Sequence, residues 1–171
     1  IIDGSTIRVG QDIIGLASSG LHSNGFSLVR RLLLEQERLQ PDSFIPACNR
    51  TAGEVLLEPT RIYVEPVLKL LRQFPVSGMA HITGGGFYDN IPRILPRACR
   101  ALIRTGTWEV PPIFSYLQEV GRITDEEMLN VFNCGIGFIL VADPEYSNEI
   151  IGLLRAMGQN AYCIGAVVAR E

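Results

Sequence analysis

The apolar positions of the first half of the chain predict one buried strand and two helices. Residues 12–17 form a short apolar run that ends in Ser and Gly residues, which is typical of a buried strand. Residues 26–39 are apolar on most sides and predict a helix packed deep in the fold. A second helix is predicted by apolar residues at i, i+3, i+4 and i+7 spacing: Val64, Val67, Leu68 and Leu71.

The second half alternates strands and helices. Strands are predicted over 76–82, 99–104, 135–142 and 161–168. A short helix towards Leu95 is expected after the first of these strands. Thr124 with Glu127 matches a capping box and starts a helix that carries Met128, Val131 and Phe132 inward. Asp143, as the N-cap before Pro144, starts another, with its buried stripe at Ile150, Leu153, Leu154 and Met157. This order predicts a sheet covered by helices.

Composition restricts the class of protein. The 171 residues are 47% hydrophobic, which is enough for one globular domain, and no apolar run approaches the ~20 residues of a membrane-spanning helix. A net charge of −3 without a basic stripe argues against a role in nucleic-acid binding. The four cysteines form no CxxC pair and indicate a reducing cytoplasm. The start at Ile1, without Met or a leader, is expected for the interior of a longer chain.

Two familiar catalytic motifs are excluded. The only lysine, Lys69, lies between two leucines, so the chain has no GxxxxGK[ST] phosphate loop. The only histidines, His22 and His81, are too far apart for an HExxH zinc motif.

The loop over 18–25 is the first candidate site. It contains small residues, hydroxyls, an imidazole and a carboxamide, and it lies between a strand and a helix, where backbone N–H groups can hold an anion. The alternative is a tight turn in which Ser and Asn only cap the helix. The candidate ligand-binding side chains are Ser18, Ser19, His22, Ser23 and Asn24.

The triplet Gly84, Gly85 and Gly86 is the second candidate site. It follows a predicted strand and lets a ligand approach the main chain, with a phosphate as the natural occupant. Arg93 follows closely enough to reach such a phosphate. The alternative is a sharp corner with His81 hydrogen-bonded inside the core. GxGxxG is not matched, because a non-glycine residue occupies the last position.

A third segment, residues 133–137, leads into a predicted central strand. Its glycines favour close packing of backbones, which is a structural role. Cys134 is expected to be a small buried residue and not a nucleophile.

Four segments together resemble the C-terminal half of the aminoimidazole ribonucleotide synthetase family, also called phosphoribosylformylglycinamidine cyclo-ligase. They are GLASSGLHSNGFSLVR at 15–30, PTRIYV at 59–64, HITGGGFYDNIPR at 81–93 and FNCGIG at 132–137. The resemblance implies an α+β fold in which helices flank a mixed sheet, partly ferredoxin-like. It also implies that residues 1–171 are a single domain of a longer two-domain enzyme.

The activity that the resemblance implies is the ATP-dependent ring closure of formylglycinamidine ribonucleotide to aminoimidazole ribonucleotide in purine biosynthesis. In such enzymes the N-terminal half supplies the homodimer interface, much of the ATP site and the Mg²⁺ ligands. The isolated domain is therefore expected to be inactive. The alternatives are a related ATP-dependent enzyme, of the selenophosphate synthetase or thiamine-monophosphate kinase type, and a phosphometabolite-binding module without catalysis.

The resemblance also implies roles for individual residues. His22 would contact the reacting group, as proton shuttle or as charge stabiliser. The glycine triplet would hold a phosphate, that of the ribonucleotide more than that of ATP. No metal ligand is assigned to this half. The remaining binding candidates are Ser18, Ser19, Ser23, Asn24, His81, Thr83 and Arg93.

Overall fold

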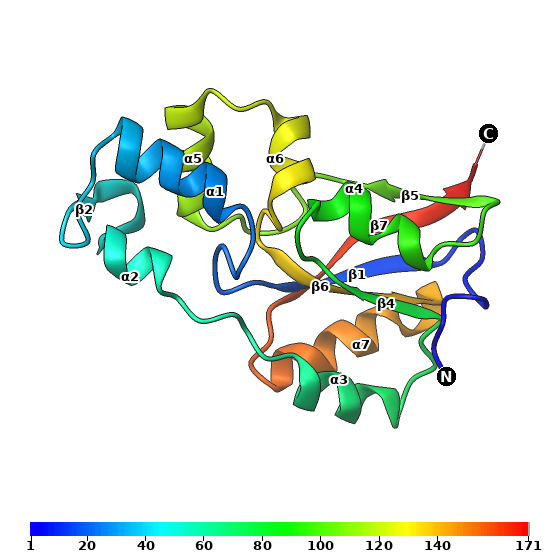
Figure 1. The fold of residues 1–171 in the computed structure, drawn as a ribbon. Helices are drawn as coiled ribbons and strands as arrows, with labels where there is room; N and C mark the ends of the chain where they lie inside the picture. Colours follow the sequence, from blue (N-terminus) through cyan, green and yellow to red (C-terminus); the bar gives the residue numbers. More distant parts are fainter. Residues whose placement is uncertain (171) are drawn as a thin grey trace.

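The computed structural model describes residues 1–170, and a five-stranded sheet lies at its centre (Figure 1). The order across the sheet is β4-β6-β1-β7-β5, and every neighbouring pair is antiparallel. The strands are β1 (Asp12–Ala17), β4 (Gly78–His81), β5 (Cys99–Ile103), β6 (Ile136–Ala142) and β7 (Ala161–Ala169).

Four of these strands form a ferredoxin-like core. Along the chain, β1, helix α3 (Val64–Leu71), β4, β6, helix α7 (Pro144–Ala156) and β7 follow the β-α-β-β-α-β order, and β5 is added beside β7. The α+β class expected from the resemblance is confirmed. The sheet is antiparallel and not mixed, because each helical connection leaves room for one strand of opposite direction between the two strands it joins.

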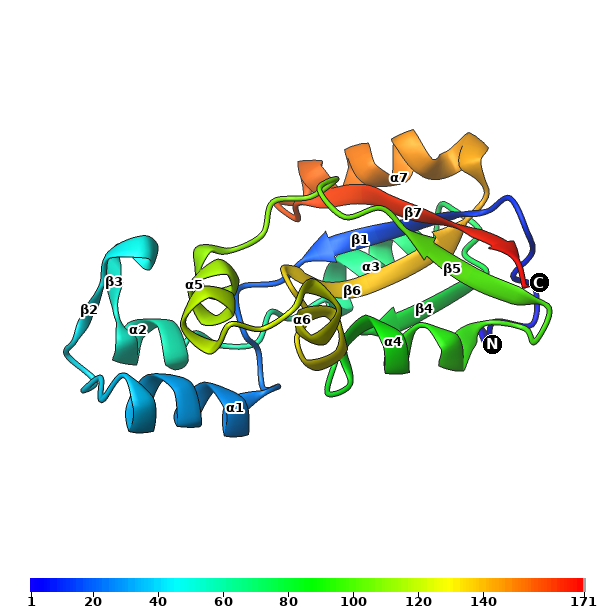
Figure 2. The same cartoon turned by 90° about the horizontal axis from the view of Figure 1, so that it is seen from above.

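Helices cover both faces of the sheet. Figures 1 and 2 show α3 and α7 on one face and α4 (Gly86–Asn90) and α6 (Asp125–Val131) on the other. Successive side chains of β1 belong to different cores, because strand side chains alternate between faces. Ile13 packs in the cluster with Phe114 and Phe132, whereas Ile14 packs in the cluster with α3 and α7.

A smaller lobe extends from one end of the sheet (Figure 2). In it, α1 (Phe26–Arg30) continues as a π-helical segment (Arg31–Gln36), so the helix expected over 26–39 ends earlier. The hairpin β2 (Phe44–Ile45) and β3 (Arg50–Thr51) encloses a 3₁₀ turn (Pro46–Cys48) and leads into α2 (Ala52–Leu56). Helix α5 (Pro112–Gly121) packs against this lobe.

The other predicted elements are present, with differences in detail. A 3₁₀ turn (Pro92–Ile94) follows α4. Thr124 Oγ1 accepts the Glu127 N–H at the start of α6. Asp143 precedes α7 without capping it through its side chain, because the carboxylate binds the Arg8 guanidinium at 2.7 Å.

The face of α3 that packs inward differs from the expected one. Val67 and Leu70 pack against the sheet, together with Pro66, whereas Val64 and Leu68 are exposed. The helix is apolar on a wider face than the sheet can cover.

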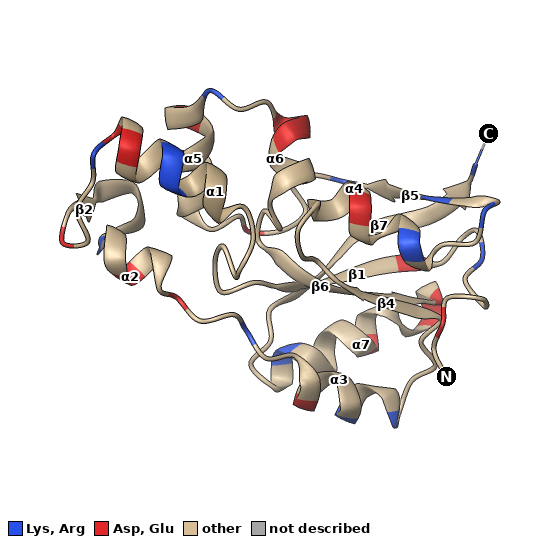
Figure 3. Cartoon of the chain, viewed as in Figure 1, with Lys and Arg blue, Asp and Glu red and all other residues tan. Residues whose placement is uncertain are grey.

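Charged residues and cysteines are dispersed over the fold. In Figure 3, segments of both signs are interspersed over the outer helices and loops. No helix within the described residues is long and apolar enough to cross a membrane. All four cysteines are free thiols.

Candidate functional site

The sheet topology brings the sequence motifs to one end of the molecule. Strands β1 and β4 both pair with β6 in antiparallel fashion, so their carboxyl ends meet where β6 begins. Ala17, at the end of β1, is paired with Ile136, and His81, at the end of β4, is paired with Phe138. The loop over 18–25, the glycine triplet and residues 133–137 therefore converge.

Four rings form the centre of this region. The ring centroid of His22 lies 6.2 Å from those of both Tyr63 and His81, and the Tyr63 and His81 centroids are 6.0 Å apart. Phe138 lies 5.4 Å from Tyr63. Tyr63 comes from the segment at 59–64, and Gly137, from the segment at 132–137, adjoins both Tyr63 and His22. All four motifs of the resemblance therefore contribute to one place in the fold.

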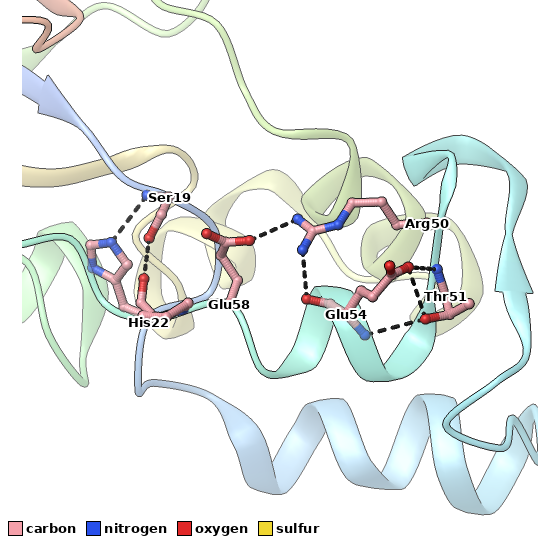
Figure 4. Close-up of polar contacts among 7 residues, drawn as sticks. Ser19, His22, Arg50, Thr51, Glu54 and Glu58 are labelled. Carbon is pink, nitrogen blue, oxygen red and sulfur yellow. Dashed lines mark hydrogen bonds and ion pairs between the residues drawn. The ribbon is translucent and has the colours of Figure 1, made fainter.

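His22 is buried and holds two backbone segments together. His22 is 5% exposed, and its backbone is in the left-handed region, with φ at 58°. Nε2 accepts the N–H groups of Ser19, at 3.2 Å, and Arg61, at 3.4 Å; Figure 4 shows the first of these bonds. Nδ1 is buried without a partner in the described part of the chain. The ring thus joins the loop after β1 to the segment before α3.

The protonation state of His22 follows from these contacts. Burial, together with the smaller effects of the nearby His81 and Arg61, lowers its pKa to about 4. The ring is therefore neutral at pH 7. Because Nε2 accepts two N–H groups, the proton of the neutral ring resides on Nδ1.

The serine hydroxyls of the loop are engaged within the protein. Ser18 Oγ donates to Asn133 Oδ1 at 2.9 Å. Ser19 Oγ donates to the Pro59 carbonyl at 2.6 Å, and Ser23 Oγ lies 3.2 Å from Thr60 Oγ1. These bonds set the shape of the loop and tie it to the segment that carries Arg61 and Tyr63. None of them caps α1, whose N-cap is Gly25 without a side-chain hydrogen bond, so the capping alternative is wrong.

Asn133 is a residue of the site that sequence reasoning did not single out. It is fully buried, and its Nδ2 donates to the carbonyls of Gly20, at 2.9 Å, and Leu21, at 3.3 Å. Its Oδ1 accepts from Ser18 Oγ and from the Gly135 N–H. The sequence offered one signal for this role: Asn133 precedes Gly135 and Gly137 at the start of a predicted strand.

The glycine triplet forms a tight turn, and a buried side chain stabilises it by hydrogen bonds to its carbonyl groups. The Gly86 N–H donates to the Thr83 carbonyl, and Gly85 has φ 87° and ψ 3°, as in the third residue of a type II turn. The buried Asn90 donates to the carbonyls of Thr83, Gly84 and Gly86 at 2.8–3.2 Å. Thr83 Oγ1 also donates to Asn90 Oδ1.

The three glycines are needed for different reasons. A Cβ on Gly86 would collide with the Leu129 carbonyl, and one on Gly85 would collide with its neighbour Asp89. Gly84 is exposed, and the nearest atom to its Cβ position is Asn24 Oδ1 at 3.8 Å. The fold therefore requires the second and third glycines, and it does not require the first.

His81 lies outside the core, contrary to the alternative of a core histidine. It is exposed at the end of edge strand β4, and partial burial lowers its pKa. The Arg93 guanidinium lies 3.4 Å from Asn90 Oδ1, on the 3₁₀ turn that follows α4.

Gly137, the second residue of β6, has a role beyond the expected close packing of backbones. A Cβ on Gly137 would collide with Tyr63 Oη and would lie 2.5 Å from His22 Cε1, so this glycine makes room for the two rings. The Tyr63 hydroxyl donates to the Ala17 carbonyl, and burial raises its pKa. Cys134 is buried, as expected, and its pKa is raised to about 12, chiefly by burial.

An ion-pair cluster lies on the other side of the loop, in the smaller lobe (Figure 4). Arg50 pairs with Glu58 at 2.8 Å and donates to the Glu54 carbonyl. Glu54 also accepts the N–H of Thr51, which lowers its pKa. The cluster braces the segment that leads to residue 59.

A match over residues 8–171 to the model of "AIR synthase related protein, C-terminal domain" defines the class of protein. The chain belongs to this family. Curated relatives named phosphoribosylformylglycinamidine cyclo-ligase are 53% identical over 171 residues in Bacillus subtilis strain 168 and 51% identical over 167 residues in Syntrophus aciditrophicus. These matches cover 100% and 98% of this chain, but 49% and 48% of the relatives. The chain thus spans about half their length.

Solved structures share the fold at low sequence identity. Thiamine-monophosphate kinase from Stenotrophomonas maltophilia has a TM-score of 0.66 at 16% identity, over 99% of this chain and 51% of that one. E. coli HypE has a TM-score of 0.61 at 19% identity, over 98% and 47%. T. maritima PurL, complexed with AMPPCP, has a TM-score of 0.56 at 12% identity, over 98% and 23%.

Proposed function

We propose that residues 1–171 are the C-terminal domain of a two-domain phosphoribosylformylglycinamidine cyclo-ligase. The observation that carries the proposal is an identity of about one half, over the whole chain, to cyclo-ligases from distant bacteria. The convergence of four motifs around His22 supports it. The longer protein is then a cytoplasmic homodimer whose N-terminal half contributes most of the ATP site.

The proposed reaction has two parts. ATP transfers a phosphoryl group to the formyl oxygen of formylglycinamidine ribonucleotide, which forms a phosphorylated imidate. An amidine nitrogen of the same molecule then attacks that carbon, phosphate leaves, and the imidazole ring closes. Such a reaction depends mainly on positioning and electrostatic stabilisation.

The Mg²⁺ ligands are assigned to the N-terminal half, as the resemblance implies. Within residues 1–170, no group of three or more His, Cys, Asp or Glu side chains is placed to hold a metal ion.

Phosphate binding is assigned to the glycine turn. Asn90 binds carbonyl groups of the turn from the buried side, which leaves the exposed Gly84 free for approach by a ligand. The ribonucleotide phosphate is the proposed occupant, with Asn24, Thr83 and His81 beside it. Arg93 lies on the 3₁₀ turn that follows α4, and we assign it a role through Asn90, which its guanidinium contacts.

His22 is assigned a role as a neutral hydrogen-bond donor. With a pKa near 4 and Nε2 engaged by two N–H groups, the ring is a poor proton shuttle at pH 7. The polar group left unpaired is Nδ1–H, which is buried among the described residues, so a substrate atom can reach it only if the loop over 18–25 moves on binding. Of the two roles implied by the resemblance, stabilisation of developing negative charge is the one that we propose. Ser18, Ser19 and Ser23 then act by holding the loop.

The test is to join the N-terminal half of the B. subtilis relative to Ile1 and to measure ATP-dependent formation of aminoimidazole ribonucleotide. We expect activity from the longer chain and none from residues 1–171 alone. ATP consumption with a different acceptor would favour a related superfamily enzyme. Selective binding of phosphate esters by the isolated chain, without turnover of the longer one, would favour a binding module.

A further inference from the structure

Arg61 is a half-buried cation beside the candidate site, on the connection that Figure 1 shows between α2 and α3. Within residues 1–170 its guanidinium forms no ion pair, and its one hydrogen bond is to Gln159 Oε1, at 3.4 Å. A guanidinium carries five N–H groups, so most of them are left for a partner outside the described residues.

The main chain of Arg61, and not its side chain, helps to hold the loop over 18–25. The Arg61 N–H donates to His22 Nε2 at 3.4 Å. Two residues later, the Tyr63 hydroxyl donates to the Ala17 carbonyl. These bonds fix the position of Arg61 against the ring cluster. Because none of them involves the guanidinium, the side chain can be replaced without loss of a bond that shapes the loop.

The positive charge of Arg61 reaches two rings of the cluster. Burial, then His81 and then Arg61 lower the pKa of His22. Burial raises the pKa of Tyr63, and Arg61 opposes this larger effect. The guanidinium therefore lies near the ring that we assign to the reacting atoms. A permanent cation at this position stabilises negative charge that develops beside the ring.

The Arg61 side chain also borders a cavity that a ligand can enter. The cavity has a volume of about 230 Å³, and Ser18 and Asn160 line it together with Arg61. The contact with Gln159, the neighbour of Asn160, places the guanidinium on this side of the connection. Arg61 is the only Lys or Arg among the described residues that line the cavity, and Glu109, the acidic lining residue, forms no ion pair with it.

We propose that Arg61 is a catalytic residue that binds the phosphoryl group during its transfer to the formyl oxygen and its departure as phosphate. The inference rests on the proposed function. It separates two phosphate sites, because the glycine turn holds the phosphate of the ribonucleotide, whereas Arg61 acts at the reacting end of the same molecule. The planar guanidinium can donate to two phosphoryl oxygens at once.

Negative charge develops on the phosphoryl oxygens in both parts of the reaction. The formyl oxygen forms a bond to the γ-phosphorus, the bond from that phosphorus to ADP breaks with its electron pair on ADP, and the adjoining amide N–H releases its proton. An amidine nitrogen then forms a bond to the formyl carbon and loses a proton, while the C–O bond breaks and phosphate departs with the electron pair. A fixed cation at the phosphoryl group therefore lowers both barriers.

The kinetic test uses the longer chain, with the N-terminal half of the B. subtilis relative joined to Ile1. Arg61→Gln removes the charge, and Arg61→Lys keeps the charge without the planar fork. Arg97→Gln, at an exposed position between α4 and β5, is the matched control. For Arg61→Gln we expect a roughly 100-fold lower kcat, with the KM for the ribonucleotide changed less than about threefold, because the contact is made mainly in the transition state.

Arg61→Lys should retain more activity than Arg61→Gln, and the control should match the parent. A raised KM with an unchanged kcat would overturn the proposal, since Arg61 would then bind the substrate equally in the ground and transition states. Unchanged kinetics would also overturn it. A lower melting temperature with full activity per folded molecule would give Arg61 a structural role and would overturn the catalytic one.

A second measurement requires no turnover. The chain contains only two histidines, so proton NMR of residues 1–171 can follow the ring signals of His22 and His81, assigned with His22→Gln and His81→Gln. Titration with inorganic phosphate, at constant pH and ionic strength, should shift the His22 signal in the parent and in Arg97→Gln, and not in Arg61→Gln. The His81 signal, beside the glycine turn, should respond in all three. Absence of a His22 shift in the parent, or equal shifts in Arg61→Gln, would overturn the proposal.

The two measurements separate this inference from the proposed function. A His22 shift that requires Arg61, together with a longer chain that lacks ring closure, would support the phosphate contact and would contradict the proposed function. Ring closure at the parent rate by Arg61→Gln would leave the proposed function standing and would overturn the inference.

Discussion

His22 shows how a single buried side chain can join segments that lie far apart in the chain. Its Nε2 accepts N–H groups from residues 19 and 61, and its neutral state results from burial. The same burial makes the residue sensitive to acid, because protonation of the ring would place a charge where there is little solvent and would remove the acceptor of both hydrogen bonds.

We expect the protein to lose stability as the pH falls from 6.5 to 4, and His22 to be a main cause. An unfolded chain binds a proton at the ordinary histidine pKa of 6.5, whereas the folded chain resists until about 4, so protons favour unfolding. The contribution is on the order of 3 kcal/mol. Urea unfolding of His22→Gln across this range should show a shallower pH dependence. His81→Gln, which changes an exposed ring, should retain most of it; an unchanged slope in His22→Gln would contradict the assignment.

Gly137 is the second residue whose role is decided by its neighbours. Gly137→Ala places a methyl group against Tyr63 Oη and His22 Cε1, so we expect a loss of about 1–3 kcal/mol in the free energy of unfolding. Gly152→Ala, in α7 with open space around its Cβ position, should instead gain about 0.5–1 kcal/mol. Thermal denaturation of both variants measures the contrast; similar effects would mean that the two rings move aside freely.

At the scale of elements, different residues of the turn between β4 and α4 serve the fold and the proposed binding of a ligand. Asn90 satisfies the carbonyls of the turn, and the left-handed Gly85 and Gly86 set its course. Gly84 contributes little to this frame. The requirement for a glycine there can therefore be tested without disturbing the fold.

Gly84→Ala should leave the free energy of unfolding within about 0.5 kcal/mol of the parent protein. In the longer chain it should raise the KM for the ribonucleotide roughly tenfold, because the added methyl group obstructs the phosphate, a cost of about 1.4 kcal/mol. Gly86→Ala should lose about 1–3 kcal/mol of stability, since its Cβ meets the Leu129 carbonyl. Unchanged kinetics in Gly84→Ala would contradict phosphate binding at this turn.

At the scale of the whole molecule, the two cores share one sheet. Neighbouring β1 residues pack in different clusters, so neither face of the sheet can lose its order without disturbing the other. We expect a single cooperative transition in urea. Fluorescence of the only tryptophan, Trp108, which is 7% exposed and stacked on Phe87, reports on one face. Circular dichroism, to which the long helix α7 on the other face contributes, should give the same midpoint; two separate midpoints would show that the faces unfold independently.

The sequence predicted the limits of the strands and the positions of the motifs better than it predicted which face of a helix is buried. The apolar runs that predict β1, β6 and β7 are long and bounded by turn residues, so their limits agree with the structure within a few residues. Helix α5 was not predicted, because the apolar stripe after its two prolines is short. The periodicity of α3 identified a helix, but it could not show which apolar residues the sheet would cover and which it would expose.

The sequence by itself determined the elements, the glycine turn and the family resemblance, because these depend on residues that are near one another in the chain. The tertiary structure alone decided that the sheet is antiparallel, that His22 is buried and neutral while His81 is exposed, and that Asn133 and Asn90 hold the two candidate loops. Burial and hydrogen-bond partners depend on which distant segments meet, and the sheet topology sets those meetings.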